Sequence, residues 1–220
     1  MRGALGPGDV AVDIGAYKGG YTYWMRRAVG DTGSVVAFEP QPELAAYLRR
    51  CVRDFGWQNV HVEECALSSE PGSRRLHVPA GGPSPGASLV GASLPPGAGS
   101  YDVRVDTLDR RLDAHPEDAA VRLIKCDVEG HELDVFLGAA VTLETLRPHV
   151  LFECEARHLR GLTMRDVFAH LERRGYRGSF FWKGERLDVS AFDARRHQIE
   201  GRRPYGNNFL FTACEPPVGR

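Results

Sequence analysis

The sequence predicts a single α/β domain, residues 1–220, built on a mostly parallel β-sheet. Short apolar runs alternate with longer segments of helical period, as in repeated strand–helix units. Four of these runs carry an acidic residue at or next to their end, where an open parallel sheet places its ligands. The chain has 220 residues, 42% of them hydrophobic, which is enough to bury one substantial core.

Short runs rich in β-branched and aromatic residues predict the strands, namely residues 9–14, 34–38, 60–63, 101–105, 120–126, 149–152, 178–182 and 208–213. Apolar residues at helical spacing predict helices over residues 20–29, 42–55, 107–112, 132–137 and 164–174. Pro42 suits a first helical turn, and Gly56 and Gly175 suit helix ends. The last two strands have no helix between them, so we expect an antiparallel hairpin at the sheet edge.

Residues 79–100 differ in composition from the rest of the chain. Glycine, proline and serine make up 15 of these 22 residues, so the stretch cannot bury enough apolar surface to hold a regular element. Because strands are predicted on both sides, we interpret it as a loop insertion within the domain. It is either a disordered linker or a mobile loop that orders over a substrate.

The overall charge disfavours several classes of partner. Lysine and arginine number 28 against 29 acidic residues, a net charge of −1. Proteins that wrap nucleic acid or coat anionic membranes need a basic excess, so we expect neither partner. The sequence has no apolar run of about 18 residues, and we expect no signal peptide because the first residues lack an uninterrupted apolar stretch. Its five scattered cysteines form no CxxC pair, so a cytoplasmic protein with free thiols is expected. The sequence does not indicate the oligomeric state.

The acids that accompany the strands are Asp13, Glu39, Asp127 and Glu153. Each could instead cap the helix that follows, since carboxylates accept hydrogen bonds from helix N-terminal amides. The turn after Asp13 is glycine-rich but is not GxGxxG, so a pyrophosphate site is not evident. At the end of the second strand, Glu39 can accept hydrogen bonds from a ribose diol. An adenosyl ligand is therefore expected, and the missing glycines favour S-adenosylmethionine over NAD.

Five segments then resemble the FkbM family of S-adenosylmethionine-dependent methyltransferases: VDIGAYKGGYT (12–22), AFEPQPE (37–43), NV…CALS (59–68), VDTLD (105–109) and IKCDVEGHELDVFLGA (124–139). The resemblance runs from about residue 9 to residue 156. It implies a class I (Rossmann-like) methyltransferase fold, with a seven-stranded, mostly parallel sheet and an antiparallel edge hairpin. It also implies O-methylation of a hydroxyl on a sugar, a polyketide or another small molecule.

The resemblance implies a cofactor site as well. Its expected residues are Asp13, Gly15, Ala16, Tyr17 and Thr22 at the methionine end, Glu39 and Pro40 at the ribose, Glu64, Cys65 and Ala66 at the adenine, and Asp127 beyond the fourth core strand. The family commonly has Asn where this chain has Tyr17.

Methyl transfer to an alcohol needs an in-line arrangement and a base that takes the hydroxyl proton. Four residues after Asp127, His131 is the candidate base, with Asp127 orienting either His131 or the methionine moiety. Alternatively, His131 only packs at the turn. Lys125, on an interior strand, is expected to pair with an acid such as Glu153.

The sequence also leaves room for a metal site and for two other functions. Asp127, Glu153, Glu155 and His158 offer donors for Mg²⁺, but they form no compact ligand motif, so we expect no metal. The alternatives to a methyltransferase are an NAD-dependent oxidoreductase and a nucleotide-binding scaffold without turnover. Residues 79–100 and 183–205 are expected to select the acceptor.

Overall fold

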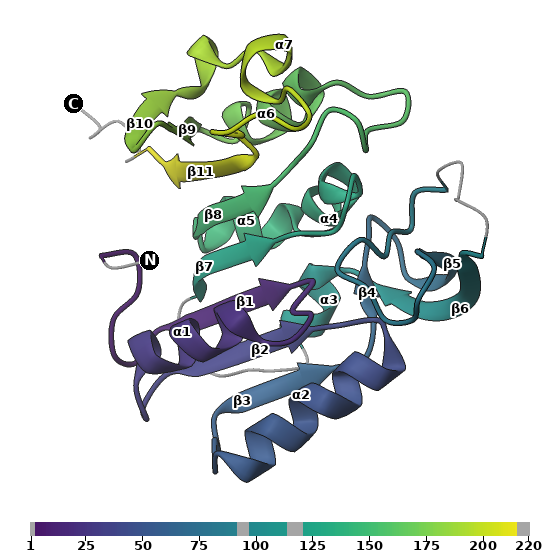
Figure 1. The fold of residues 1–220 in the computed structure, drawn as a ribbon. Coiled ribbons are helices and arrows are strands. Elements are labelled where there is room, and N and C mark those ends of the chain that lie inside the picture. Colours follow the sequence, from purple (N-terminus) through teal and green to yellow (C-terminus); the bar gives the residue numbers. More distant parts are fainter. Residues whose placement is uncertain (1–2, 92–96, 114–120, 215–220) are drawn as a thin grey trace.

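The computed structural model describes residues 3–91, 97–113 and 121–214 (Figure 1). Its main sheet has eight strands, which are β1 (Val10–Ile14), β2 (Ser34–Phe38), β3 (Val60–Glu63), β7 (Val121–Cys126), β8 (His149–Glu153), β9 (Tyr176–Trp182), β10 (Glu185–Asp188) and β11 (Asn208–Ala213). They lie in the order β10-β9-β11-β8-β7-β1-β2-β3. Five neighbouring strands of this sheet are parallel, namely β8, β7, β1, β2 and β3, and β11 runs antiparallel to both β8 and β9.

The mostly parallel sheet expected from the sequence is confirmed, but it has eight strands rather than seven. The additional strand, β10, forms a hairpin with β9 through Lys183 and Gly184, which both have positive φ. The two strands expected to form the edge hairpin, β9 and β11, do pair antiparallel. However, β11 lies inside the sheet and β10 forms its edge. Three of the four residues of β10 are charged and exposed, and the fourth, Leu187, is a single apolar residue, so the segment carries no hydrophobic pattern that could predict a strand.

Helices cover both faces of the sheet. Their bounds are α1 (Gly20–Val29), α2 (Pro42–Asp54), α3 (Leu108–Asp113), α4 (Glu132–Leu137), α5 (Ala140–Thr145), α6 (Met164–Glu172) and α7 (Ala194–His197), with a 3₁₀ turn at Val189–Ala191. On one face, Met25 of α1 packs with Ala11 and Val35, and Leu48 of α2 packs with Ala37. The other face packs against α3 to α6 in the largest cluster of buried residues. Helices α1 and α2 thus hold the residues that follow β1 and β2.

A second, three-stranded sheet contains β4 (Ala66–Leu67), β5 (Gly72–Val78) and β6 (Gly99–Asp106), in the order β4-β6-β5. The strand expected at 101–105 therefore belongs to this small sheet. Strands β5 and β6 pair antiparallel from Gly72↔Val105 to Val78↔Gly99, so the glycine- and proline-rich segment connects a hairpin. Residues 99 and 100, which the sequence assigns to the end of this loop, are part of β6. Residues 92–96 of the loop and Ala120 lie outside the described residues.

Across residues 3–91, 97–113 and 121–214, no helix is both long and apolar enough to cross a membrane. All five cysteines are free thiols, as expected.

Candidate functional site

A cavity of about 260 Å³ lies beyond the carboxyl ends of β1, β2 and β7. Its walls come from the glycine turn after β1, the end of β2, strand β4, the turn after β7 and part of the glycine- and proline-rich segment. Nine residues expected at the site from the sequence line it: Gly15, Ala16, Tyr17, Glu39, Pro40, Cys65, Ala66, Asp127 and His131. Three expected residues, Asp13, Thr22 and Glu64, are not among those that line it.

The glycine turn brings backbone close to the cavity. Gly15 has φ +72°, and a Cβ there would lie 1.9 Å from the carbonyl oxygen of Asp127. The amides of Gly15 and Ala16 both donate to the Phe38 carbonyl at 3.0 Å, which fixes the turn against β2. Tyr17 has φ +50°, a region in which Asn is favoured among non-glycine residues. The turn therefore needs glycine at position 15 to pass the end of β7.

Asp13 and Thr22 lie behind the glycine turn. Asp13 is completely buried and accepts a 2.6 Å hydrogen bond from the Thr22 hydroxyl. Its other carboxylate oxygen lies 3.6 Å from the Lys125 ammonium, which is also 3.6 Å from Asp127. Lys125 thus pairs with two acids, neither of which is Glu153, the expected partner. We conclude that Asp13 and Thr22 stabilise the glycine turn on the side away from the cavity.

Glu64 faces away from the cavity and forms a 2.7 Å ion pair with Arg49. The side chains alternate after β3, so that Cys65 is buried where Glu64 is exposed. Only Cys65 and Ala66 of the three expected adenine-side residues line the cavity.

Glu39, at the end of β2, is one of the acids that line the cavity. Its carboxylate accepts hydrogen bonds from the backbone amides of Tyr17, at 2.8 Å, and Gln41, at 2.9 Å, and from the Gln41 side chain at 3.2 Å. Burial raises the pKa of Glu39, although these donors oppose the rise. A carboxylate has about four acceptor positions, so one remains beside the three bonds. The geometry suits an acid that also accepts from a ligand hydroxyl.

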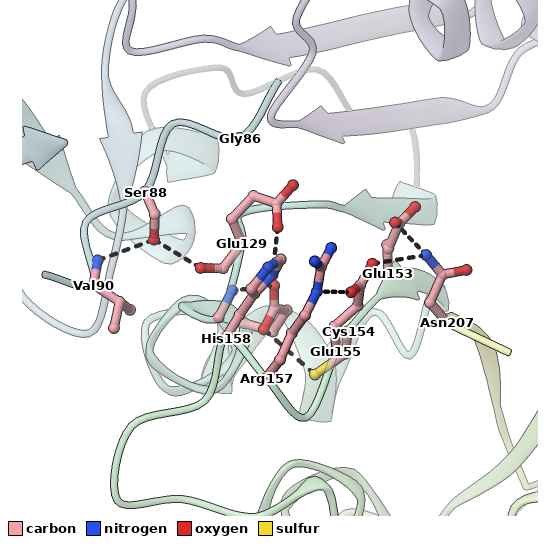
Figure 2. Close-up of polar contacts among 12 residues, drawn as sticks. Gly86, Ser88, Val90, Glu129, Glu153, Cys154, Glu155, Arg157, His158 and Asn207 are labelled. Carbon is pink, nitrogen blue, oxygen red and sulfur yellow. Dashed lines mark hydrogen bonds and ion pairs between the residues drawn. The ribbon is translucent and has the colours of Figure 1, made fainter. Parts of the chain in front are cut away.

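Gln41 ties the glycine- and proline-rich segment to the cavity, a role that the sequence did not reveal. Its side-chain amide exchanges two 2.9 Å hydrogen bonds with the backbone of Ser84. Farther along, Ser88 bridges to His77 through two 2.9 Å backbone bonds and donates from its hydroxyl to the Glu129 carbonyl at 2.7 Å (Figure 2). The described part of the segment thus forms part of the cavity wall, and its contacts with Gln41, His77 and Glu129 hold it there.

His131 lines the cavity, but both of its ring nitrogens have protein partners. Nε2 lies 2.9 Å from the Ser68 hydroxyl and Nδ1 lies 3.3 Å from the Asp134 carboxylate. Burial lowers the pKa of His131, although Asp134 opposes the change. Asp127, expected as one possible orienting group, pairs with Lys125 instead. The His131 ring is instead oriented by Asp134, which lies three residues farther along the chain, in α4.

Acidic side chains gather beyond the ends of β7 and β8 (Figure 2). Glu129 forms a 2.5 Å ion pair with His158, and this bond raises the pKa of His158. Glu155 accepts from Arg157 at 2.5 Å and from the Tyr205 hydroxyl at 2.9 Å. Among the described residues, no group of three or more His, Cys, Asp and Glu side chains is placed to hold a metal ion.

Glu153 closes β8 and differs from these acids. Its carboxylate accepts from the side-chain amide of Asn207, which also donates to Glu155 at 3.2 Å (Figure 2). Burial, followed by the charges of Asp127 and Glu129, raises the pKa of Glu153 to about 7.

A second buried acid, Glu132, holds the turn between β7 and α4. It is completely buried and accepts a 3.0 Å hydrogen bond from the amide of Gly130. Burial raises the pKa of Glu132 to about 7. Its carboxylate therefore fixes the backbone that presents Asp127 and His131.

Comparison with known proteins identifies the family. The model of the methyltransferase FkbM domain matches residues 13–177, which include every wall of the cavity. The chain belongs to the FkbM methyltransferase family. The resemblance read from the sequence is confirmed, and with it S-adenosylmethionine as the cofactor of this FkbM methyltransferase domain. No curated protein matches the sequence significantly.

Solved structures agree on the fold of this FkbM domain. An FkbM methyltransferase from Methylobacillus flagellatus KT superposes with a TM-score of 0.58 at 16% identity, covering 92% of this chain and 43% of that one. An rRNA methylase from Streptococcus thermophilus gives 0.53 at 9% identity, over 97% and 92%. A SAM-dependent O-methyltransferase from Thermotoga maritima gives 0.50 at 13% identity, over 96% and 62%. The chain thus spans less than half of the Methylobacillus protein.

Proposed function

We propose that the chain transfers the methyl group of S-adenosylmethionine to a hydroxyl of a small molecule, such as a sugar or a polyketide. The observation that carries the proposal is the cavity, which runs from Glu39 to Asp127 along the carboxyl edge of the sheet. Bound there, the cofactor supplies an electrophilic methyl group on a positively charged sulfur. The acids beyond β7 and β8 suit that charge, and the net charge of −1 disfavours a nucleic-acid acceptor.

The residues present fit the cofactor. Gly15 places backbone, without a side chain, at one end of the cavity, and the turn that contains it would hold the methionine moiety. Glu39 accepts from the ribose hydroxyls, and Cys65 and Ala66 border the adenine. Asp127, at the end of β7, lines the cavity and would face the reacting end of the cofactor.

Replacing Glu39 with glutamine tests the cofactor site. We expect S-adenosylhomocysteine to bind the unaltered protein with micromolar affinity in calorimetry, and NAD not to bind. Glu39→Gln is expected to weaken binding of S-adenosylhomocysteine about 10- to 100-fold, because hydrogen bonds to a charged acceptor contribute about 1.5–3 kcal/mol. Glu43→Gln, an exposed neighbour in α2, is the control and should bind as the unaltered protein does. Equal affinity of Glu39→Gln and the control would contradict the ribose assignment.

The role of His131 has its own test. As the base, His131 would have to exchange its bond with Ser68 for one with the acceptor. The contacts of both nitrogens favour a positioning role, in which the ring ties the turn after β7 to β4. We therefore expect His131→Ala to lower kcat less than 10-fold at saturating substrates, measured by transfer of radiolabelled methyl. A loss of 100-fold or more would establish His131 as the base.

The acceptor class is tested by a screen for methyl transfer to alcohols. Sugars, polyketide alcohols and ribosomal RNA would each be incubated with the protein and radiolabelled cofactor. Incorporation into a small alcohol supports the proposal. Incorporation into RNA alone, or into none of the three, overturns it.

A further inference from the structure

Methyl transfer to a hydroxyl requires a base that takes the hydroxyl proton. The contacts of the acidic side chains beyond the ends of β7 and β8 distinguish one candidate for this base. Glu129 pairs with His158, and Glu155 pairs with Arg157. Asp127 has Lys125 as its partner. Among the described residues, Glu153 and Glu132 are the acids near the ends of β7 and β8 that have no ion pair; Glu132 is completely buried and holds the Gly130 amide, whereas Glu153 is half-buried and its bond comes from the neutral amide of Asn207. Glu153 is thus the carboxylate that no cation neutralises and that is not completely buried.

The strand register places Glu153 next to Asp127, a residue of the cavity wall. In the parallel pair β7–β8, Cys126 aligns with Phe152, so the next residues, Asp127 and Glu153, are neighbours at the carboxyl edge. Asp127 lines the cavity and Glu153 does not, so Glu153 lies one strand beyond the cofactor cavity, on the side where the proposal requires the acceptor to bind. Tyr21 of α1 lines the same end of the cavity, and the charges of Glu153 and Asp127 both act on its hydroxyl.

We propose that Glu153 is the base that takes the proton of the acceptor hydroxyl. This inference rests on the proposed function. The acceptor oxygen forms its bond to the methyl carbon as the bond from carbon to sulfur breaks, and the hydroxyl proton moves to the Glu153 carboxylate. The sulfonium leaves as a neutral thioether, and Glu153 returns its proton to water.

The surroundings of Glu153 set the pH at which it works. Burial and the negative charges of Asp127, Glu129 and Glu155 raise its pKa to about 7, and Lys125 opposes them. Tyr21, whose pKa is raised mainly by burial, stays neutral at this pH. Because only the carboxylate accepts a proton, activity should fall as the pH falls through about 7.

The test uses the alcohol that accepts the most methyl in the screen above. Glu153→Gln keeps the shape of the side chain and its contact with Asn207, but it cannot take a proton. We expect kcat to fall about 100- to 10,000-fold, the usual range for a lost general base, with S-adenosylhomocysteine affinity within about threefold. If some activity remains, the plot of its kcat against pH should no longer show an inflection near pH 7. Glu153→Asp, which retains a carboxylate, should recover part of the rate.

Glu155→Gln is the matched control, because it removes a neighbouring carboxylate that already has a cation partner, and we expect kcat to stay within about fivefold. The inference is overturned if Glu153→Gln turns over as fast as the control, or if the inflection near pH 7 persists in it. If the unaltered protein itself methylates no alcohol, the proposed function fails instead, and the two failures are thus distinct.

Discussion

Gly15→Ala is expected to abolish detectable binding of S-adenosylhomocysteine and to destabilise the fold by about 2–5 kcal/mol. Two costs add: a residue with a Cβ loses about 1–2 kcal/mol at the positive φ of Gly15, and forced overpacking costs about 1–3 kcal/mol. The atom that the new Cβ would meet is a backbone oxygen, that of Asp127, at 1.9 Å. It cannot rotate away as a side chain can, so the end of β7 must move.

The measurements are urea unfolding and calorimetric titration. Gly20→Ala is the control for stability, since a Cβ at Gly20 meets nothing within 4 Å and Gly20 begins α1. Alanine there should leave the free energy of unfolding unchanged or raise it by at most about 1 kcal/mol. If Gly15→Ala were as stable as Gly20→Ala and bound the ligand normally, the close approach of the turn to β7 would be wrong.

Elements with a strong local pattern were predictable from the sequence. The bounds of α1 and β2 match the expected ranges residue for residue, because a continuous apolar run and flanking glycines mark them. Strand β5 was missed because its first four residues are exposed and polar, and α5 because it follows α4 with only two residues between them. Such elements owe their structure to neighbours: β5 to its pairing with β6, α5 to packing on the core.

At the site, too, features with a local sequence pattern were predictable and features that depend on distant contacts were not. Glu39 was predictable because an acid that directly follows a strand lies at the edge of the sheet. The partners of charged side chains were not, since they depend on contacts between distant segments. Gln41 and Ser84 are 43 residues apart, and His131 and Ser68 are 63 residues apart. Residue spacing along the chain cannot supply such pairs. The sequence therefore suggests Glu153 as an ion-pair partner of Lys125, whereas in the structure the Lys125 ammonium lies between Asp13 and Asp127.

Lys125→Met is expected to destabilise the fold by about 3–5 kcal/mol, the usual cost of removing one partner from a buried ion pair. Lys125 is 5% exposed, and its ammonium donates to the Gly15 carbonyl at 3.1 Å and lies 5.0 Å from the centre of the Tyr21 ring. Although burial opposes it, the charges of Asp13 and Asp127 raise the pKa of Lys125, which therefore stays charged. Methionine fills a similar volume but leaves two carboxylates without a cation.

Urea unfolding at several pH values separates this charge effect from a packing effect. Burial raises the pKa of Asp127, and loss of Lys125 should raise it further. A carboxyl whose folded-state pKa is raised destabilises the fold in its charged form, so the cost of Lys125→Met should shrink as the pH falls through that pKa. A cost that does not change with pH would indicate packing alone.

Two further variants complete the test of Lys125. Lys183→Met, at an exposed position in the β9–β10 turn, should change the free energy of unfolding by no more than about 0.5 kcal/mol. Combining Lys125→Met with Asp13→Asn removes both charges of the fully buried pair, so the double variant should be more stable than Lys125→Met alone by at least about 1 kcal/mol. If the two losses simply add, Asp13 and Lys125 do not interact. In that case the support beneath the glycine turn must come from the Thr22 hydrogen bond instead.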